Sequence, residues 1–270
     1  MKRGRIMKLA SIGSNCVDFY TNIDGGKAFA GGGPVNMAVY TIRLGGTASY
    51  IGPVGNDAYG RFMIEEIKKK GIDTSHLYVK EGKTAVSNVS LIDGERVFGD
   101  YDEGVLKEYS LSKEDVEFIL THDVVVADLW GRVEGYFKDL KDRGMTTAFD
   151  LADNPDSERV SKAIPYVDYL FFSSNLDDMN KVMEKMKALK AMGPKLVVSM
   201  LGSSGSMCYD GTDFIRYGIK KCDDIVDTMG AGDSYIAGFL TGIISGRTIR
   251  EAMELGAETA TETLRYFGAW

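Results

Sequence analysis

The feature that most limits the fold of this chain is a regular alternation of short apolar runs with amphipathic helical segments. Buried strands are predicted at Leu9–Gly13, Ala48–Val54, Asp123–Ala127, Thr146–Asp150, Asp168–Phe172 and Lys195–Leu201. Helices are predicted between them at Pro34–Leu44, Ala58–Lys70, Val133–Asp142 and Leu176–Ala191. Strands joined through helices run parallel, and such a sheet is covered by helices on both faces. The sequence therefore predicts an α/β fold with a mostly parallel central sheet.

Two regions depart from this alternation. Thr84–Ile92 and Arg96–Tyr101 alternate apolar and polar residues around Asp93-Gly94, which is typical of a β-hairpin. A second extended pair lies at Val17–Tyr20 and Lys27–Ala30. Half-buried hairpins inserted into a parallel α/β chain usually project from the sheet, as a lid or a subunit contact. We expect one domain over residues 1–270, with a small β lid formed by about 17–30 and 84–101.

The last third of the chain has a different pattern. A short hairpin, Met207–Tyr209 and Phe214–Tyr217, is followed by two predicted helices, Ala231–Ser245 and Thr248–Tyr266. No internal repeat or low-complexity segment interrupts this order.

Composition excludes several classes of function. The net charge of −7 argues against nucleic acid or an anionic membrane as the main partner. No apolar run reaches the roughly 18–20 residues that cross a bilayer. Lys8 interrupts the apolar stretch after the basic start, so no signal core is expected. The three cysteines, Cys16, Cys208 and Cys222, are widely spaced and are predicted to be reduced thiols of a cytoplasmic protein.

The chain has only two histidines, His76 and His122, and neither stands in a catalytic or metal-binding motif. A zinc site built on paired histidines is therefore disfavoured, and so is a serine hydrolase.

The strongest chemical signal is the run Asp227-Thr228-Met229-Gly230-Ala231-Gly232-Asp233-Ser234, directly before a predicted helix. Small residues at a helix start leave backbone N–H groups bare, and the helix dipole adds positive potential, so Gly230, Ala231 and Gly232 can receive a phosphate. Asp233 lies in the first turn and is placed to take a proton from a hydroxyl that attacks phosphorus. An ordinary N-terminal cap is the alternative interpretation of Asp233.

A second signal is Gly31-Gly32-Gly33-Pro34-Val35-Asn36, between an extended segment and a helix. The glycines allow a ligand to approach the backbone, and Asn36 offers both a donor and an acceptor. Together with Asp18, Gly32 and Asn36 suit a polyhydroxylated ligand. The run is neither a dinucleotide-binding fingerprint nor a Walker loop. A plain strand–turn–helix connection is the alternative.

Two weaker motifs follow later strands. Gly202 and Gly205 form a G-x-x-G turn after Lys195–Leu201 that can pass its amides along a nucleotide. Asn175 and Asp178 lie one helical turn apart, which suits either a hydrated Mg²⁺ or a helix cap.

Together and in this order, the motifs resemble the ribokinase-like (PfkB) family of carbohydrate kinases across nearly the whole chain. The resemblance implies a three-layer α/β/α sandwich with a β lid, and ATP and Mg²⁺ as donor and cofactor. Asp233 would be the catalytic base, and Gly230, Ala231 and Gly232 the anion hole. The implied sugar contacts are Asp18, Gly32 and Asn36, and the implied nucleotide contacts are Asn175, Gly202 and Gly205. The implied metal ligands are Asp178, in a shortened N-x-x-E motif, for Mg²⁺ and Asp227 for K⁺.

Three further segments resemble members of the family that phosphorylate the 6-hydroxyl of the Amadori product fructoselysine. They are 96–105, Trp130-Gly131 and 266–270. The resemblance implies that Arg96 and Tyr101 contact this zwitterionic substrate. Lid charges that are merely solvated are the alternative.

The sequence therefore predicts an ATP-dependent sugar kinase that acts on fructoselysine. The alternatives are kinase activity on an unmodified sugar, such as fructose or 2-keto-3-deoxygluconate, and a non-catalytic sugar-binding regulator on the same fold. A homodimer formed through the lid is a further expectation. Neither nucleic acid nor a membrane is expected as a partner.

Overall fold

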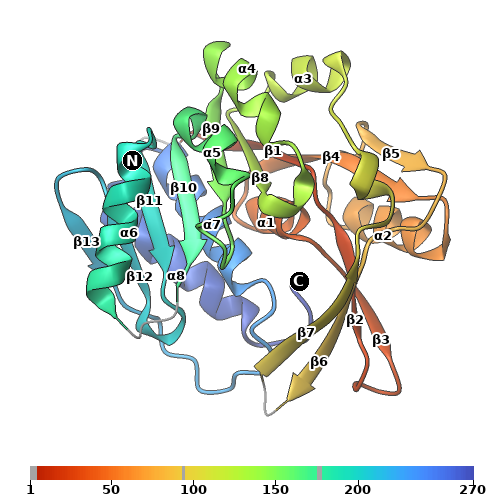
Figure 1. The fold of residues 1–270 in the computed structure, drawn as a ribbon. Coiled ribbons are helices and arrows are strands. Elements are labelled where there is room, and N and C mark those ends of the chain that lie inside the picture. Colours follow the sequence, from red (N-terminus) through yellow and green to blue (C-terminus); the bar gives the residue numbers. More distant parts are fainter. Residues whose placement is uncertain (1–4, 93–94, 175–177) are drawn as a thin grey trace.

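The computed structural model describes residues 5–92, 95–174 and 178–270, which form two sheets (Figure 1). Within these residues the central sheet has the strand order β13-β12-β11-β10-β9-β8-β1-β4-β5. All neighbours from β5 to β11 are parallel, whereas β12 and β13 are antiparallel additions at one edge. The bounds are β1 (Lys8–Ile12), β4 (Thr47–Gly55), β5 (Leu77–Lys80), β8 (Val124–Asp128), β9 (Thr146–Asp150), β10 (Tyr169–Ser173), β11 (Leu196–Met200), β12 (Ser206–Tyr209) and β13 (Phe214–Tyr217).

Helices cover both faces of the central sheet, which confirms the predicted α/β/α sandwich. One face carries α1 (Gly33–Arg43), α2 (Ala58–Lys69), α7 (Ala231–Ile244) and α8 (Ile249–Thr263). The other carries α3 (Lys113–Ile119), α4 (Phe137–Asp142), α5 (Val160–Ala163) and α6 (Met179–Ala191). Short 3₁₀ turns lie at η1 (Gly104–Glu108), η2 (Leu129–Gly131), η3 (Glu134–Tyr136), η4 (Ile164–Tyr166) and η5 (Gly202–Ser204).

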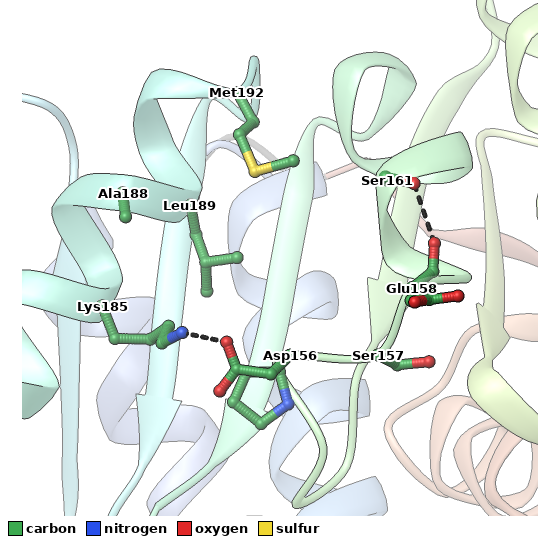
Figure 2. Close-up of a pocket in the computed structure, with 9 residues that line it drawn as sticks. Asp156, Ser157, Glu158, Ser161, Lys185, Ala188, Leu189 and Met192 are labelled. Atoms are coloured by element: carbon green, nitrogen blue, oxygen red, sulfur yellow. Dashed lines mark hydrogen bonds and ion pairs between the residues drawn. The ribbon is translucent and has the colours of Figure 1, made fainter.

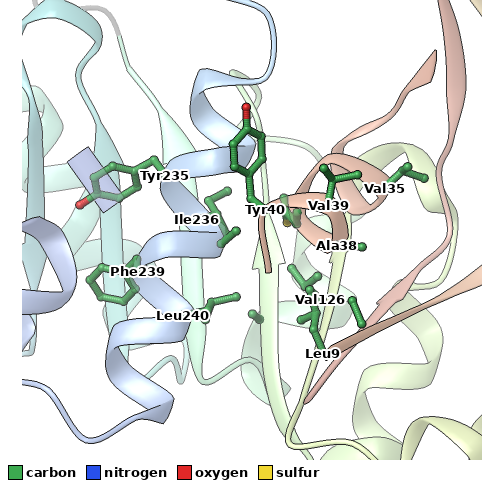
Figure 3. Packing of buried hydrophobic residues seen from close by; sticks show 14 of the residues in the cluster. Leu9, Val35, Ala38, Val39, Tyr40, Val126, Tyr235, Ile236, Phe239 and Leu240 are labelled. Atoms are coloured by element: carbon green, nitrogen blue, oxygen red, sulfur yellow. The ribbon is translucent and has the colours of Figure 1, made fainter. Parts of the chain in front are cut away.

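The strand sequences account for this double cover. Successive side chains of a strand point to opposite faces, so an entirely apolar strand supplies two cores at once. In β8, Val124 and Val126 join the core under α1 and α7, whereas Val125 and Ala127 join the core on the other face. Figure 3 shows side chains of α1 and α7 gathered with Leu9 and Val126 of the sheet. The packing of α1 against α7 brings the two glycine motifs of the sequence together.

A second, smaller sheet projects beyond the carboxyl ends of the central strands (Figure 1). Its order is β3-β2-β6-β7, with β2 and β6 parallel and the outer pairs antiparallel. The bounds are β2 (Cys16–Tyr20), β3 (Lys27–Gly31), β6 (Val86–Ile92) and β7 (Glu95–Asp102). We call these four strands the small sheet.

Some elements differ from the sequence-based prediction. Neither β5 nor α3 was predicted, because both are too short to show a clear pattern of apolar residues. The helix predicted at Val133–Asp142 is split into a 3₁₀ turn and α4. The helix predicted from Leu176 begins at Met179, because Asp178 has extended backbone and caps the amides of Asn180 and Lys181.

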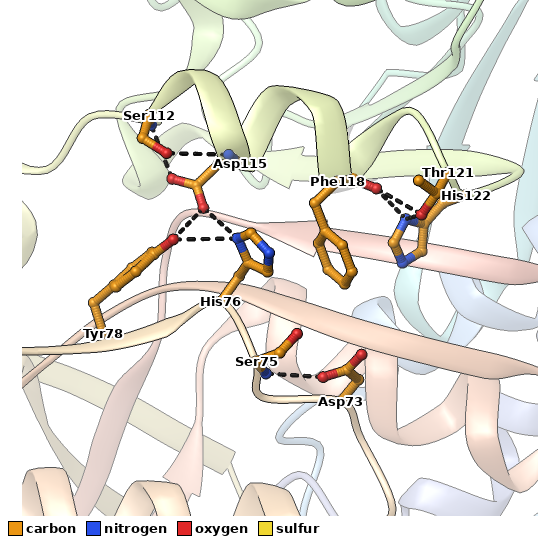
Figure 4. A network of polar contacts seen from close by, with 9 residues as sticks. All are labelled: Asp73, Ser75, His76, Tyr78, Ser112, Asp115, Phe118, Thr121 and His122. Atoms are coloured by element: carbon orange, nitrogen blue, oxygen red, sulfur yellow. Dashed lines mark hydrogen bonds and ion pairs between the residues drawn. The ribbon is translucent and has the colours of Figure 1, made fainter.

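Both histidines belong to a polar network where α3 covers β5 (Figure 4). The Asp115 carboxylate accepts a hydrogen bond from the Tyr78 hydroxyl at 2.6 Å and lies 2.7 Å from His76 Nδ1. His122 Nε2 lies 2.8 Å from the Ser49 hydroxyl. Burial lowers the pKa of His122, which favours its neutral form. These contacts tie α3 to the sheet.

None of the helices in the described ranges has the length and apolar character needed to cross a membrane.

Candidate active site

A cavity of about 550 Å³ lies between the small sheet and the carboxyl ends of the central strands. This is the edge at which parallel α/β sheets bind their ligands. The residues that line it come from nearly every element around that edge: Ser14, Asn15, Cys16, Asp18, Gly32, Gly33, Asn36, Ser87, Arg96, Phe98, Gly99, Tyr101, Asp128, Trp130, Asp150, Ala152, Asp153, Ser173, Met200, Met229, Gly230, Gly232 and Asp233.

The two glycine motifs meet in this cavity through Asn36 and Asp233. Asn36, in the first turn of α1, donates from Nδ2 to Asp233 Oδ2 at 2.7 Å. Gly33 leaves room for this contact, since a Cβ there would lie 3.2 Å from Asp233 Oδ1 and 2.9 Å from Asp128 Oδ2. Burial raises the pKa of Asp233, and the bond from Asn36 acts against that increase. The Asp233 carboxylate is therefore held in the cavity by a donor that favours its charged form.

The start of α7 presents backbone amides to the same space. Gly230 caps the helix in the left-handed region at φ 73°, where only a glycine fits easily, and a Cβ there would lie 2.7 Å from the Ala269 side chain. The Ala231 amide donates to the Thr228 carbonyl, and the first bond of the helix itself runs from Ser234 N to Gly230 O. The amides of Gly232 and Asp233 lie between these two and face outward from the helix start. Gly232 also contacts the end of β11, with the Met200 sulfur 3.6 Å from its ideal Cβ position.

Asp18 enters the cavity from β2 of the small sheet. Its side chain is buried, and its Oδ1 lies 3.4 Å from the Cys16 thiol, the donor of that bond. Burial raises the pKa of Asp18 to about 7, and the nearby Asp233 carboxylate contributes to the increase. Asp18, Gly32 and Asn36, which the sequence singled out together, line one cavity.

The sequence analysis missed three acids at this edge: Asp128, Asp150 and Asp153. Asp128 ends β8 and Asp150 ends β9, so each could have been found as the polar residue that closes a predicted buried strand. Burial raises the pKa of Asp128 to about 7, and it raises the pKa of Asp150 as well. Asp128 accepts bonds from the Ser14 hydroxyl and from the amides of Trp130 and Gly131.

Arg96 of β7 is the only cationic side chain among the described residues that line the cavity. It donates to the Thr228 carbonyl in the loop before α7, so it bridges the small sheet and the helix start. Its charge lowers the pKa of both Asp18 and Asp233, against the larger effect of burial. Tyr101 of the same strand packs edge-on against Trp130, with ring centroids 6.0 Å apart.

Asp227 lies in the loop before α7 and is not among the residues that line the cavity. It is fully buried, and its carboxylate accepts hydrogen bonds from the Tyr20 hydroxyl at 2.5 Å, the Met229 amide at 2.9 Å and the Gly268 amide at 3.0 Å. Asp227 therefore joins the small sheet, the helix start and residues 266–270.

The remaining residues singled out by the sequence are not among those that line the cavity. Gly202 and Gly205 form the turn after β11, next to Met200, which does line it. Asp178 is the N-terminal cap of α6. Asn175 lies outside the described residues.

A second hollow of about 540 Å³ lies between the 155–161 segment and α6 (Figure 2). Lys185 forms an ion pair with Asp156, and the Ser161 hydroxyl donates to the Glu158 carbonyl. Lys185 and Asp156 are already paired, and the described residues that line this hollow include two acids, against five in the first cavity, which is therefore the stronger candidate.

In a comparison with known proteins, the family model described as "pfkB family carbohydrate kinase" matches residues 8–270. The chain is 42% identical to fructoselysine 6-kinase of Escherichia coli (strain K12), covering 97% of this chain and 99% of the relative. It is 32% identical to fructosamine kinase FrlD of Bacillus subtilis (strain 168), over 98% of this chain and 93% of the relative.

Among solved structures, ribokinase of Arabidopsis thaliana, complexed with ribose and ATP, is similar at a TM-score of 0.87. The sequence identity is 21%, and the match covers 98% of this chain and 94% of that chain. At this sequence identity the structural similarity establishes the fold of the chain and nothing beyond it.

The raised pKa of Asp18 predicts a measurable pH dependence of stability. Between about pH 4 and pH 7 the folded state holds a proton on Asp18 that the unfolded chain has released, so stability falls as pH rises through this range. In Asp18→Asn this decline should be smaller by about 3 kcal/mol, because each unit of pKa difference corresponds to about 1.4 kcal/mol. Urea unfolding of both proteins across this range measures it. The exposed Asp139→Asn serves as control, and equal slopes for wild type and Asp18→Asn would refute the prediction.

Proposed function

The chain belongs to the pfkB family of carbohydrate kinases, and from that premise we propose that it phosphorylates the 6-hydroxyl of fructoselysine with ATP. One observation carries the mechanism: the Asp233 carboxylate is held by Asn36 in the cavity, beside the outward-facing amides that begin α7. A base next to an anion-binding helix start is what phosphoryl transfer to an alcohol requires.

In this mechanism the sugar hydroxyl attacks the γ-phosphorus in line, the new O–P bond forms, and the bond from phosphorus to the β-phosphate oxygen breaks. Asp233 accepts the hydroxyl proton. The amides of Gly230, Ala231 and Gly232 would stabilise charge on the transferred group, although the Ala231 amide already donates to the Thr228 carbonyl. Asp18, Gly32 and Asn36 would hold the sugar hydroxyls.

The donor set of the cavity fits Mg²⁺ bound together with nucleotide phosphates. Within the described ranges, no three His, Cys, Asp or Glu side chains are grouped as metal ligands. Magnesium that bridges phosphates needs only one or two carboxylates and keeps several waters, so Asp150 and Asp153 would suffice. Asp178 caps α6 and is a weaker candidate than the sequence suggested. The metal would supply charge neutralisation on the phosphates.

The residues present do not fit K⁺ at Asp227, because its carboxylate already accepts three hydrogen bonds from the protein. We assign no step to K⁺.

The charges in the cavity favour a substrate that carries an amine. Asp18, Asp128, Asp150, Asp153 and Asp233 face the cavity, against Arg96 alone. With a neutral ketose as substrate, Mg²⁺ alone would offset the negative charge of these aspartates. A fructosamine adds a second positive charge, that of its amine. Arg96 can pair with the carboxylate of the lysine part. Among the other charged side chains near the lid, Glu103 and Arg132 already form an ion pair with each other. Arg96 is therefore the best placed to bind the carboxylate of the lysine part.

The relatives named for fructoselysine and fructosamine are more similar to this chain than those named for unmodified sugars, such as 5-dehydro-2-deoxygluconokinase of Bacillus velezensis at 28% identity. Kinase activity on an unmodified sugar is therefore not favoured. A non-catalytic regulator is not favoured either, since the Asn36–Asp233 contact has no use in a mere binder.

The small sheet would act as a lid that excludes water during transfer. A homodimer through the lid stays a prediction, which the exposed side chains of Ile92, Val97 and Phe98 support. Since ATP is the donor, we place the reaction in the cytoplasm.

Coupled ATP-turnover assays against fructoselysine, other fructosamines, fructose and ribose test the substrate. We expect kcat/KM for fructoselysine to exceed that for fructose by about tenfold or more, because fructose leaves charged groups unpaired. NMR of the product should place the phosphate on the 6-hydroxyl. A preference for fructose would reject the fructosamine assignment, and absence of turnover with every sugar would reject the mechanism.

Asp233→Asn should lower kcat by about 10²–10⁴, the range for loss of a general base, because an amide cannot take the hydroxyl proton. Sugar binding should largely be kept, as measured by calorimetry. Asp139→Asn, an exposed carboxylate on α4, is the matched control and should turn over normally. Near wild-type turnover by Asp233→Asn would remove this residue from the role of base.

Arg96→Ala should lower kcat/KM for fructoselysine by about tenfold or more, because it removes one charge-assisted hydrogen bond to the substrate. The decrease for fructose, which has no carboxylate, should be smaller. Arg132→Ala is the matched control, since Arg132 pairs with Glu103 and does not line the cavity. Equal losses on both sugars would show that Arg96 does not recognise the lysine part.

A further inference from the structure

We propose that Trp270 is a positioning residue, which fixes the direction in which the Asn36 amide faces and thereby holds the Asp233 carboxylate in the cavity. The inference rests on the proposed function, in which Asp233 is the base. Neither the motifs nor the mechanism above gives Trp270 a role.

The contacts form an unbroken chain of hydrogen bonds. Trp270 donates from its indole Nε1 to Asn36 Oδ1 at 2.7 Å, and Asn36 donates from Nδ2 to Asp233 Oδ2 at 2.7 Å. An indole nitrogen can only donate, so the atom of Asn36 that faces Trp270 must be the carbonyl oxygen. The amide nitrogen is thereby directed at the carboxylate. The ionised Asp233 carboxylate can only accept and therefore favours the same orientation, so the two partners hold the amide from opposite ends.

The hydrogen bonds of Asn36 to Trp270 and Asp233 also show which of its groups can still bind a substrate. Asn36 is almost fully buried yet lines the cavity. Its oxygen accepts from Trp270 and one N–H donates to Asp233, so the second N–H and the second lone pair of the oxygen are left for a ligand. Asn36 can therefore donate to one sugar hydroxyl and accept from another, whereas an ionised Asp18 carboxylate only accepts.

Several buried contacts hold Trp270 in place. The Gly268 amide donates to Asp227, and the Ala269 carbonyl accepts from the Tyr40 hydroxyl at 2.9 Å. Ala269 also lies against Gly230, the cap of α7. The segment that carries the indole is thus attached to the start of α7 and to α1, the two elements that supply Asp233 and Asn36.

The electrostatic effect on Asp233 has a definite sign. Burial raises its pKa, and the Asn36 bond acts against burial. Loosening the amide should therefore raise this pKa further and reduce the fraction of ionised base at a given pH.

The test replaces Trp270 with Phe, which keeps an aromatic ring and removes the N–H. We expect kcat to fall by about tenfold, within the span for a misplaced catalytic group, and the acidic limb of kcat/KM to move to higher pH. Trp270→His, which restores a ring N–H, should recover part of the loss. Lys70→Ala is the control, since Lys70 lies over the Trp270 ring without touching the chain of hydrogen bonds. A wild-type kcat and pH profile in Trp270→Phe would overturn the proposal.

A measurement without turnover separates this proposal from the substrate assignment. The chain has only two tryptophans, and Trp130 is 45% exposed, so each indole N–H serves as reference for the other in ¹⁵N spectra. The Trp270 N–H should exchange slowly in the wild type and faster in Asn36→Ala. Exchange as fast as that of Trp130 in the wild type would overturn the proposal, whether or not any sugar is phosphorylated and whether or not Trp270→Phe folds.

Discussion

The structure depends on one contact, the hydrogen bond from Asn36 to Asp233, which joins residues 197 positions apart in the sequence. It forms because α1 and α7 pack side by side on the same face of the central sheet, over Leu9 and Val126. Each helix begins after a glycine-rich turn at the carboxyl edge of that sheet, so both first turns open into one cavity. The apolar core thus brings the Asn36 amide within reach of the Asp233 carboxylate, and the hydrogen bond between them sets how the two groups face each other.

The cavity concentrates negative charge at a cost in stability. Asp18, Asp128 and Asp150 are buried, and burial raises the pKa of each. Each would be more stable if neutral or paired with a cation. A fold that keeps such groups together must recover the cost elsewhere, here in two fully apolar cores. The excess of acid is relieved when a cationic ligand or metal enters, which couples binding to the charge state of the site.

A feature of the fold or the site could be predicted from sequence when the residues that form it are close together in the chain. The parallel sheet followed from the alternation of strands and helices, and Asn36 and Asp233 were found because glycine motifs mark the helix starts locally. Asp128 and Asp150 each stand at the end of a predicted strand, but which strand ends open into one cavity depends on the strand order in the sheet, and this is why both were missed. Asp178 fitted two local roles, and only the cap contacts to Asn180 and Lys181 separate them. The bond from Trp270 to Asn36 spans most of the chain, and no local pattern reports it.

The small sheet is more than a cover, because it carries part of the site. Two hydrogen bonds connect it to the loop before α7, and they differ in burial. The bond from Tyr20 to Asp227 is fully buried, whereas Arg96 donates to Thr228 from a half-buried position. The buried bond is made by β2, the strand that also carries Asp18, so it holds Asp18 at a fixed position relative to Asp233. Arg96 belongs to β7, at the far side of the small sheet, where a bond to a backbone carbonyl can be exchanged for a bond to a ligand at little cost. In the proposed function, Asp18, which would hold the sugar, therefore lies on the strand with the buried hydrogen bond, and Arg96, which would recognise the lysine part, lies on the outer strand.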